Sequence, residues 1–382
     1  MEEQIVYKIS QQKPSILERF GLYYLTFFRR IDSDHSAFNV TDEELTKRVN
    51  NITLKGIILS CLIGIVCVFP TVWVDVYFAD AKPLIHYAWV GVVTIISLAI
   101  ELYILFLIAL RAVYEVSEII NLNATEADLQ QDGLFSVKHI LARTALEIPD
   151  PELEILGVDP FKRISKKNLL VLGLLYKAKI FLTNFVVKYL LLFTVGNTIL
   201  GISILYVSII VECFWNSVVI TRVVHEARLR LFGFALANQI GKNVLENNML
   251  DNLSPLARKG CLRAIGNAVV MSQNYHPNMI ILFIRFQQIL KISEVDKYDD
   301  WNIFLDTLQQ VSAEERYFLL DLFTVSAAFD GKLSGLEKAN LQGAYQNDFS
   351  IYAPRIENLT QYLKQGKLNA ALKESQLDFK AG

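Results

Sequence analysis

Polar and ionisable side chains recur inside three of the four long apolar stretches of this sequence, where they could hold a proton or an ion. They are Glu101 in the second stretch, Lys177, Asn184 and Lys188 in the third, and Ser208, Glu212 and Asn216 in the fourth. Ionisable groups at bilayer depth are costly, and they are usually paired or functional. We therefore treat these residues together as one candidate site, an intramembrane polar seam.

The spacing of the seam residues predicts which of them share a helix face. In the third stretch the lysines and the asparagine recur at intervals of seven and four residues, and in the fourth stretch the interval is four throughout. Glu101 and Lys177 lie about 25 and 27 Å below the outer turns at the helical rise per residue, so they could form an ion pair. Glu212, at about 21 Å, is level with neither lysine, so it either reaches Lys177 through helix tilt or faces water.

Two interpretations of the seam stay open at this point. The first is a set of interhelical contacts, satisfied internally, that holds the bundle together. The second is a hydrated path or ligand cavity lined by Asn184, Lys188, Ser208, Glu212 and Asn216. Because four spans make a thin bundle, a conducting path would require several copies of the chain.

The elements that must position the seam are transmembrane helices. We expect spans over 54–79, 84–112, 174–195 and 198–221, each long enough to cross about 30 Å of hydrocarbon. Inside lipid all backbone polar groups need internal partners, so these spans must be helical. Short turns join them into two transmembrane hairpins, over 54–112 and 174–221. No alternating strand pattern occurs elsewhere, so the expected fold class is all-α, a polytopic membrane protein with four spans.

The distribution of lysine and arginine predicts which side of the membrane each loop faces. Basic residues precede the first span, occur along the loop over 113–173 and follow the fourth span, whereas the two short hairpin turns contain only Lys82. Loops rich in lysine and arginine stay in the cytoplasm. We therefore expect a multi-pass protein of the cell inner membrane with both termini cytoplasmic. An interfacial aromatic belt is expected near the first outer turn, at Trp73, Tyr77, Phe78, Tyr87 and Trp89.

Cytoplasmic regions flank the spans on both sides. Within 1–53, the aromatic segment 14–31 ends in Arg29 and Arg30; it either lies in the membrane interface, with these arginines at the phosphates, or packs on the protein itself. Thr41 and Glu44 have the spacing of a capping box that would start a helix leading into the first span. Residues 222–254 would continue the fourth span as a stalk, and residues 255–382 would form a separate helical domain.

One motif in the C-terminal region has a specific spacing. An apolar helix is expected to end at Phe329, Asp330 and Gly331 turn the chain, and Ser334 and Glu337 have the spacing of a capping box for the next helix. This unit resembles the helix–turn–helix of the tellurite-resistance TerB-like domain, a family that includes the cytoplasmic part of a membrane-anchored DnaJ-like co-chaperone. The resemblance implies a domain of paired helical halves, with the earlier half over 260–285.

The resemblance also implies a divalent metal held by acidic residues of the turn, which here would be Asp330 and Glu337. In the earlier half, Gln273, Asn274 and His276 stand where acidic residues would be expected. Carboxylates provide most of the affinity for a hard cation, so two acids fit a helix cap better than a metal site. Capping is therefore the expected role, a bound divalent metal is the alternative, and no other cofactor is expected.

The sequence contains no catalytic motif, so we expect no enzyme. The net charge of −2, without a basic face, gives no case for nucleic-acid binding. We expect a membrane-anchored cytoplasmic interaction or sensing module, of the kind used in a bacterial envelope or stress response. Its partners would be the lipid bilayer and a protein on the cytoplasmic side. The alternative is an oligomeric ion channel or transporter, assembled as a homo-oligomer, that uses the polar seam.

Overall fold

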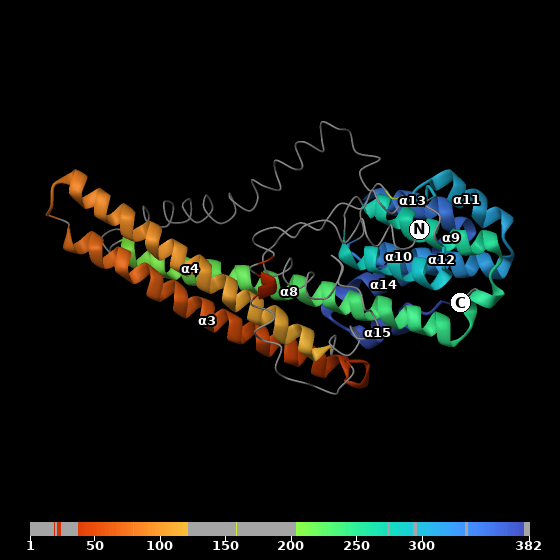
Figure 1. The fold of residues 1–382 in the computed structure, drawn as a ribbon, viewed down its shortest axis with the longest axis horizontal. Coiled ribbons are helices and arrows are strands. Elements are labelled where there is room, and N and C mark those ends of the chain that lie inside the picture. Colours follow the sequence, from red (N-terminus) through yellow and green to blue (C-terminus); the bar gives the residue numbers. More distant parts are fainter. Residues whose placement is uncertain are drawn as a thin grey trace.

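The structure is a computed structural model that describes residues 19, 21–23, 37–78, 80–120, 158, 204–272, 276–292, 296–332 and 335–377. Every regular element within these ranges is a helix, which confirms the expected all-α class. Long helices form a bundle at one end of the molecule, and shorter helices gather into a domain at the other (Figure 1). One long helix belongs to both parts.

The bundle consists of α3 (Asp42–Tyr77), α4 (Pro83–Ile119) and the first half of α8 (Ile204–Glu246). α3 starts where the sequence predicts, because the Thr41 hydroxyl accepts a hydrogen bond from the Glu44 backbone nitrogen at 3.4 Å. Pro83 opens α4 at a position where a missing backbone N–H leaves no helical bond unmade. α3 and α4 form a helical hairpin, and α8 packs against both of them (Figure 1).

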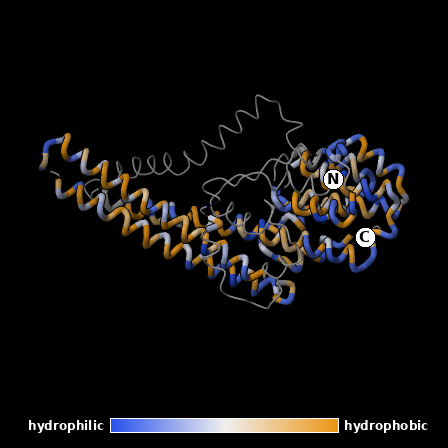
Figure 2. Tube along the Cα trace, viewed as in Figure 1, coloured by the Kyte–Doolittle hydropathy of each residue, from blue (hydrophilic) through white to orange (hydrophobic). Residues whose placement is uncertain are grey.

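Two of the described helices, α3 and α4, are long and apolar enough to cross a membrane. Only 28% of the most apolar stretch of α3 and 11% of that of α4 is buried, whereas the core helix of a soluble protein is mostly buried. Apolar residues recur along both helices (Figure 2). Of the four expected spans, the third lies outside the described residues, and the fourth is described only from Ile204 onward, within α8.

α4 continues beyond the expected end of the second span, as far as Ile119. Its apolar positions remain buried there, since Val113 and Val116 are both 0% exposed. They belong to one cluster with Leu45 of α3 and Ile220 of α8, which are equally buried. The end of the bundle nearest the helical domain is therefore an ordinary hydrophobic core, and this packing extends the helix.

The helical domain also contains shorter helices. In chain order they are α9 (Pro255–Ser272), α10 (Pro277–Leu290), α11 (Trp301–Gln310), α12 (Ala313–Ala328), α13 (Gly335–Tyr345), α14 (Phe349–Gln365) and α15 (Leu368–Glu374). Short 3-10 helices precede α3, α9 and α14, as η1 (Ala37–Asn39), η3 (Met249–Asn252) and η4 (Gln346–Asp348).

The second half of α8 lies inside this domain, which differs from the stalk expected over 222–254. Leu236 and Ala237 are 0% exposed, as in a core helix. Gly233 permits close contact with α10, since a Cβ at this position would lie 2.0 Å from Asn278 Nδ2. The apolar periodicity of a stalk and of a core helix is the same, so the sequence pattern did not separate the two.

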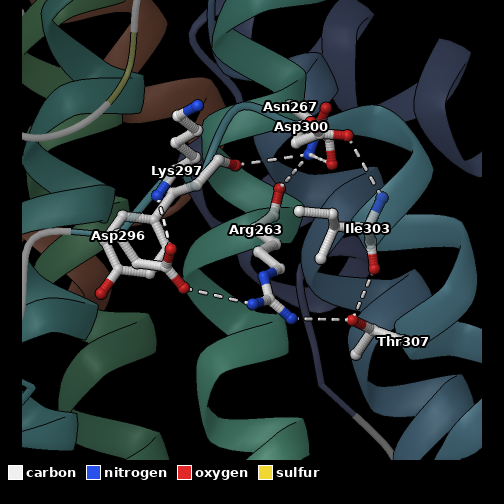
Figure 3. A network of polar contacts seen from close by, with 8 residues as sticks. Arg263, Asn267, Asp296, Lys297, Asp300, Ile303 and Thr307 are labelled. Carbon is white, nitrogen blue, oxygen red and sulfur yellow. Dashed lines mark hydrogen bonds and ion pairs between the residues drawn. The ribbon is translucent and has the colours of Figure 1, made fainter.

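A buried arginine of α9, Arg263, forms hydrogen bonds with α11 and with the segment before it (Figure 3). Arg263 donates hydrogen bonds to Thr307 Oγ1 at 3.0 Å and to Asp296 Oδ2 at 3.2 Å. Asn267, one turn further along α9, donates to the backbone oxygen of Asp300 at 3.3 Å. Asp300 in turn caps α11 by accepting from two backbone nitrogens of its first turn. The network thus determines where α11 begins.

One carboxylate caps two helices of the domain. Glu315 Oε2 accepts from the Ser312 backbone nitrogen at 3.0 Å, and Ser312 Oγ accepts from that of Glu315 at 3.3 Å, which forms the capping box of α12. Glu315 Oε1 accepts from the backbone nitrogen of Ser254, immediately before α9, at 2.6 Å. Burial raises the pKa of Glu315, but the hydrogen bonds from Ser254 and Ser312 outweigh it, so the pKa lies below its ordinary value.

Candidate functional site

The bundle helices enclose a polar cluster that contains part of the predicted seam. Glu101 of α4 and Asn216 of α8 are only 4% and 2% exposed. Asn216 Nδ2 donates a hydrogen bond to Glu101 Oε1 at 2.8 Å, and it lies 3.4 Å from the backbone oxygen of Ser60 in α3. A buried polar group left without such a partner costs about 1–3 kcal/mol. The Asn216 amide of α8 therefore contacts both α3 and α4.

Small residues on α3 let α8 approach closely at this cluster. Gly56, Ser60 and Gly64 recur every four residues, and all are buried. A Cβ at Gly64 would lie 2.9 Å from Asn216 Nδ2, and a Cβ at Gly56 would lie 2.7 Å from Ile220 Cγ2. Small residues at this spacing are typical of helices that pack closely in membranes.

Glu212 lies one helical turn before Asn216 on α8 and is 2% exposed. A Cβ added at Gly64 would lie 3.2 Å from Glu212 Cγ, so this side chain packs against α3. Glu212 is therefore enclosed by protein in the described part of the bundle. Whether it reaches Lys177 or faces a hydrated path stays a prediction, since Lys177 lies outside the described residues.

Two cysteines and a serine extend the cluster along the same helix pair. Cys61 Sγ lies 3.1 Å from Ser217 Oγ and 3.5 Å from the backbone oxygen of Cys213. Cys213 Sγ lies 3.5 Å from the backbone oxygen of Cys61, so the two contacts are reciprocal. These residues and Ser60 are not among the predicted seam residues. The four-residue spacing of Gly56, Ser60 and Gly64 on α3 is a signal that could have found Ser60.

The structure brings together Glu101, Glu212 and Asn216 from the predicted seam. The side chains of the other seam residues lie outside the described residues; these residues are Lys177, Asn184, Lys188 and Ser208. The ion pair expected between Glu101 and Lys177 therefore stays a prediction. Arg29 and Arg30 also lie outside the described residues. Within the expected interfacial segment, Leu22 packs against the core and Tyr23 is 72% exposed.

A second polar junction joins the start of α3 to the end of the helical domain. The Asp42 carboxylate accepts hydrogen bonds from the backbone nitrogens of Asn369 at 2.8 Å and of Ala370 at 3.1 Å. These nitrogens belong to the first turn of α15, whose own cap residue, Lys367, makes no side-chain cap. Asn369 Nδ2 also donates to the backbone oxygen of Val40 at 2.7 Å. Asp42 therefore acts as the N-cap of a distant helix.

A contact between α8 and the segment before α15 lies close to the junction at Asp42. Arg228 Nη2 donates to the backbone oxygen of Lys364, near the end of α14. Gly366 follows with a φ of +74°, a conformation that favours glycine, and a Cβ there would lie 2.7 Å from Arg228 Cδ. The end of the domain is thus held by α3 on one side and by α8 on the other.

The turn between α9 and α10 and the turn after α12 meet beside α8. Asn278, at the start of α10, donates to the backbone oxygens of Leu229 in α8 at 3.0 Å and of Phe329 after α12 at 3.1 Å. His276 caps α10, because its Nδ1 accepts from the Asn278 backbone nitrogen at 3.4 Å. Burial, together with the positive charge of Arg230, lowers the pKa of His276 to about 3, so the ring is neutral.

The described contacts of Asp330 match the expected role in the turn after α12. Asp330 is 2% exposed, and its Oδ1 accepts from the Lys332 backbone nitrogen at 2.8 Å. Gly331 has a φ of +68°, so the turn requires a residue that tolerates the left-handed region. Within the described ranges, no group of three or more His, Cys, Asp or Glu side chains is placed to hold a metal ion. The side chains of Glu337, Gln273 and Asn274 lie outside the described residues, so the role of Glu337 stays a prediction.

Comparisons of the chain with protein-family models, with curated proteins and with solved structures found no match. The TerB-like resemblance therefore rests on the sequence motif around Asp330 alone.

Proposed function

We propose that this protein is a membrane-anchored helical module whose bilayer-embedded helices hold a cytoplasmic interaction or sensing domain. The observation that carries the proposal is the continuity of α8, which contributes Asn216 to the apolar bundle and Leu236 to the domain core. A helix of 43 residues is about 65 Å long, roughly twice the thickness of the hydrocarbon layer. The anchor and the domain thus share a continuous helix, which would transmit a displacement of one to the other.

The spacing of basic and aromatic residues on the hairpin supports the membrane assignment. On α3, Lys55 and Trp73 are about 27 Å apart along the helix, and on α4, Trp89 and Arg111 are about 33 Å apart. Both values match a hydrocarbon layer of about 30 Å bounded by basic residues on the cytoplasmic side and aromatic residues at the other interface. Large apolar side chains between these limits are exposed and would contact lipid, including Ile58, Leu62, Phe69, Ile95 and Ile96.

We further propose the full four-span topology, with a second hairpin over 174–221 and both termini in the cytoplasm of a bacterial cell. The contact between Asp42 and Asn369 supports this placement, because it puts the start of α3 on the same side as the helical domain. The basic residues near this end of the bundle support a cytoplasmic position for that side.

The helical domain is, in this proposal, a TerB-like domain. Its support is the presence of two helix–turn–helix pairs, α9 with α10 and α12 with α13, which pack against each other through α9. The hydrogen bond from Asn278 to the Phe329 oxygen joins the first helix pair to the turn of the second. Paired halves are what the motif around Asp330 led us to expect.

Photo-crosslinking in native membranes tests whether the domain binds a partner. A photoreactive residue is placed at Ile303 and at Ile351, apolar side chains of the domain that are 38% and 45% exposed. The matched control is Ile95 of α4, which is 69% exposed and would face lipid. We expect a protein adduct from at least one domain position that the control does not give. Absence of any such adduct from both domain positions would remove the support for an interaction module.

A second candidate function, an oligomeric ion channel or transporter, is favoured by one observation. Glu101 and Glu212 are carboxyl groups buried in the same cluster, and Glu101 lies about 15 Å along α4 from Arg111, well inside the hydrocarbon layer. Their enclosure within a single chain favours a packing contact over an open path, so this function ranks second. Reconstituted Glu212→Gln should then change ion flux while the fold persists. Equal flux through wild type, variant and empty liposomes would eliminate the channel.

A further inference from the structure

Two cysteine side chains of the bundle face each other across the contact between α3 and α8. Cys61 Sγ lies 3.5 Å from the backbone oxygen of Cys213, and Cys213 Sγ lies 3.5 Å from that of Cys61. Each thiol thus reaches the backbone of the other residue, and the two thiols also interact with each other. Both sulfurs are free of any disulfide. The contact joins positions that are 152 residues apart in the chain.

The two helices approach closely on both sides of this pair. A Cβ at Gly56 would lie 2.7 Å from Ile220 Cγ2, and a Cβ at Gly64 would lie 2.9 Å from Asn216 Nδ2. Cys61 lies between these two glycines on α3. A disulfide requires two Cβ atoms that point toward each other from closely spaced backbones. The reciprocal contacts and the close packing of the helices meet both conditions.

A serine hydroxyl fixes the position of one of the two sulfurs. Ser217 Oγ donates a hydrogen bond to the Cys213 backbone oxygen at 2.6 Å, and it lies 3.1 Å from Cys61 Sγ. Because the hydroxyl hydrogen is already used, the Cys61 thiol is the donor in the second contact. Ser217 is therefore a positioning residue, which holds the Cys61 sulfur beside the Cys213 backbone.

The pair is more accessible than the other cysteines of the chain. Cys61 and Cys213 are half-buried, whereas Cys67 is 6% exposed and Cys261, in the helical domain, is 0% exposed. Cys61 lies about 9 Å along α3 from Lys55, so in the proposed topology the pair lies inside the hydrocarbon layer. A reagent dissolved in lipid should therefore reach this pair first.

The location of the pair favours oxidation over metal binding. A metal would require thiolates, and a charge in hydrocarbon is costly, whereas a disulfide is as uncharged as the two thiols. Within the described ranges no third His, Cys, Asp or Glu side chain is placed to complete a metal site with this pair. Two neutral thiols held in contact thus lead to the disulfide as the product that the site accommodates best.

We propose that Cys61 and Cys213 form a redox-active pair, which a lipid-soluble hydroperoxide oxidises to a disulfide that locks α3 to α8. One sulfur attacks the terminal oxygen of the hydroperoxide ROOH, the O–O bond breaks, and a sulfenic acid and the alcohol ROH form. The second sulfur attacks the sulfenic sulfur, so the S–S bond forms, the S–O bond breaks and water leaves. The hydroperoxide accepts both electrons, and its hydrogen and the two thiol hydrogens end in ROH and water.

The disulfide would fix α8 to α3 at the helix that the bundle shares with the domain. The pairing itself rests on the packing of α3 against α8. Only the choice of a lipid-soluble oxidant rests on the proposed membrane anchor. Recovery of the chain in the soluble fraction without detergent would contradict that anchor and leave the pairing standing.

Oxidation of the full chain in lipid nanodiscs tests the pairing. The reduced protein is treated with cumene hydroperoxide, remaining thiols are blocked, and linked peptides are identified by mass spectrometry. We expect the link between Cys61 and Cys213 to form at least about tenfold faster than any link to Cys67 or Cys261, because only the pair is held in contact. Dithiothreitol, a neutral dithiol, should remove it.

The matched control moves one thiol by a single residue. Cys213→Ser combined with Phe214→Cys keeps the number of cysteines, and Phe214 is 62% exposed. Position 214 points about 100° away from position 213 around the helix, so linking to Cys61 should fall by at least about tenfold. In the wild type, hydrogen peroxide at the same concentration should form the link more slowly than cumene hydroperoxide does.

Three outcomes overturn the proposal or its oxidant. The pairing is wrong if the oxidised wild type yields no peptide that links Cys61 to Cys213, or if the control links as fast as the wild type. Equal rates with the two peroxides overturn the lipid-soluble oxidant. If the control does not fold, the wild type remains decisive, because a link from Cys213 to Cys67 that forms as fast as the link to Cys61 also contradicts the pairing.

Discussion

The Asp42 carboxylate, at the start of α3, lies 2.8 Å from the backbone nitrogen of Asn369, which is 327 residues later in the chain. Through this contact the first helix of the apolar bundle caps the last helix of the domain. The attachment of the domain to the helical bundle therefore depends in part on a hydrogen bond that a single substitution can remove.

Asp42→Ala should loosen α15 from the bundle. Loss of an N-cap costs about 0.5–2 kcal/mol, so we expect the amides of Asn369 and Ala370 to exchange roughly 2- to 30-fold faster in D42A. Asp42→Asn keeps a side-chain acceptor and should lose less. The control is Glu43→Ala, in the same turn of α3 but exposed. Unchanged exchange of α15 in D42A would mean that the cap contributes nothing to docking.

Gly64→Ala should destabilise the contact between α3 and α8. The added Cβ would meet the Asn216 amide at 2.9 Å, and overpacking of this kind costs about 1–3 kcal/mol. Gly91→Ala is the matched control, because a Cβ there meets nothing within 4 Å. Alanine is the better helix former, so G91A should be neutral or slightly stabilising. Denaturant titrations in micelles that rank the two variants in the opposite order would contradict the packing described here.

Glu101→Ala should be more harmful than Glu101→Gln. The alanine variant removes the nearer acceptor of the buried Asn216 amide and leaves it only the Ser60 oxygen at 3.4 Å, at a cost of about 1–3 kcal/mol, whereas glutamine retains a side-chain oxygen. Glu115→Ala, on the same helix, removes an exposed ion pair with Arg111 and should cost at most about 1 kcal/mol. The same titrations measure all three variants. If E101A and E115A were equally stable, the polar cluster would not hold the bundle together.

Glu315 should make the helical domain sensitive to acid. Its folded pKa lies below the ordinary value, so the stabilisation is present above the unfolded pKa, about 4.3, and is lost as the pH falls through the folded pKa. Wild type should therefore lose more stability than Glu315→Gln between about pH 5 and pH 3. Tryptophan fluorescence during denaturant unfolding reports this difference. Glu314→Gln, at an exposed position, should follow the wild type; parallel pH profiles for wild type and E315Q would contradict the double cap.

Local chemistry explains which features could be predicted from the sequence. Thr41 and Glu44 predicted the start of α3, because a cap depends on residues only three positions apart. The turn at Asp330 and Gly331 was predictable for the same reason. The interval of four residues between Glu212 and Asn216 correctly indicated that they share one helix face. In each case the deciding contacts lie within two turns of helix.

Contacts between distant segments could not be predicted in this way. Nothing in the sequence around Asp42 indicates that its partner is Asn369, since the choice depends on where the domain docks. The burial of Leu236 likewise depends on α10, so the second half of α8 was expected to be a stalk. The small residues on α3 carried a readable signal in their spacing, but their partner, Asn216, is defined only by the register of two antiparallel helices.

The side of the membrane on which each end of the hairpin lies tests the central claim most directly. Single cysteines are introduced at Asp80, in the turn between α3 and α4, and at Lys373, in α15 of the domain. Intact cells are then treated with a membrane-impermeant maleimide, with the wild type as the background for the native cysteines. We expect labelling at position 80 in intact cells and at position 373 only after the inner membrane is permeabilised. Labelling of both positions from the same side, or recovery of the chain in the soluble fraction without detergent, would contradict it.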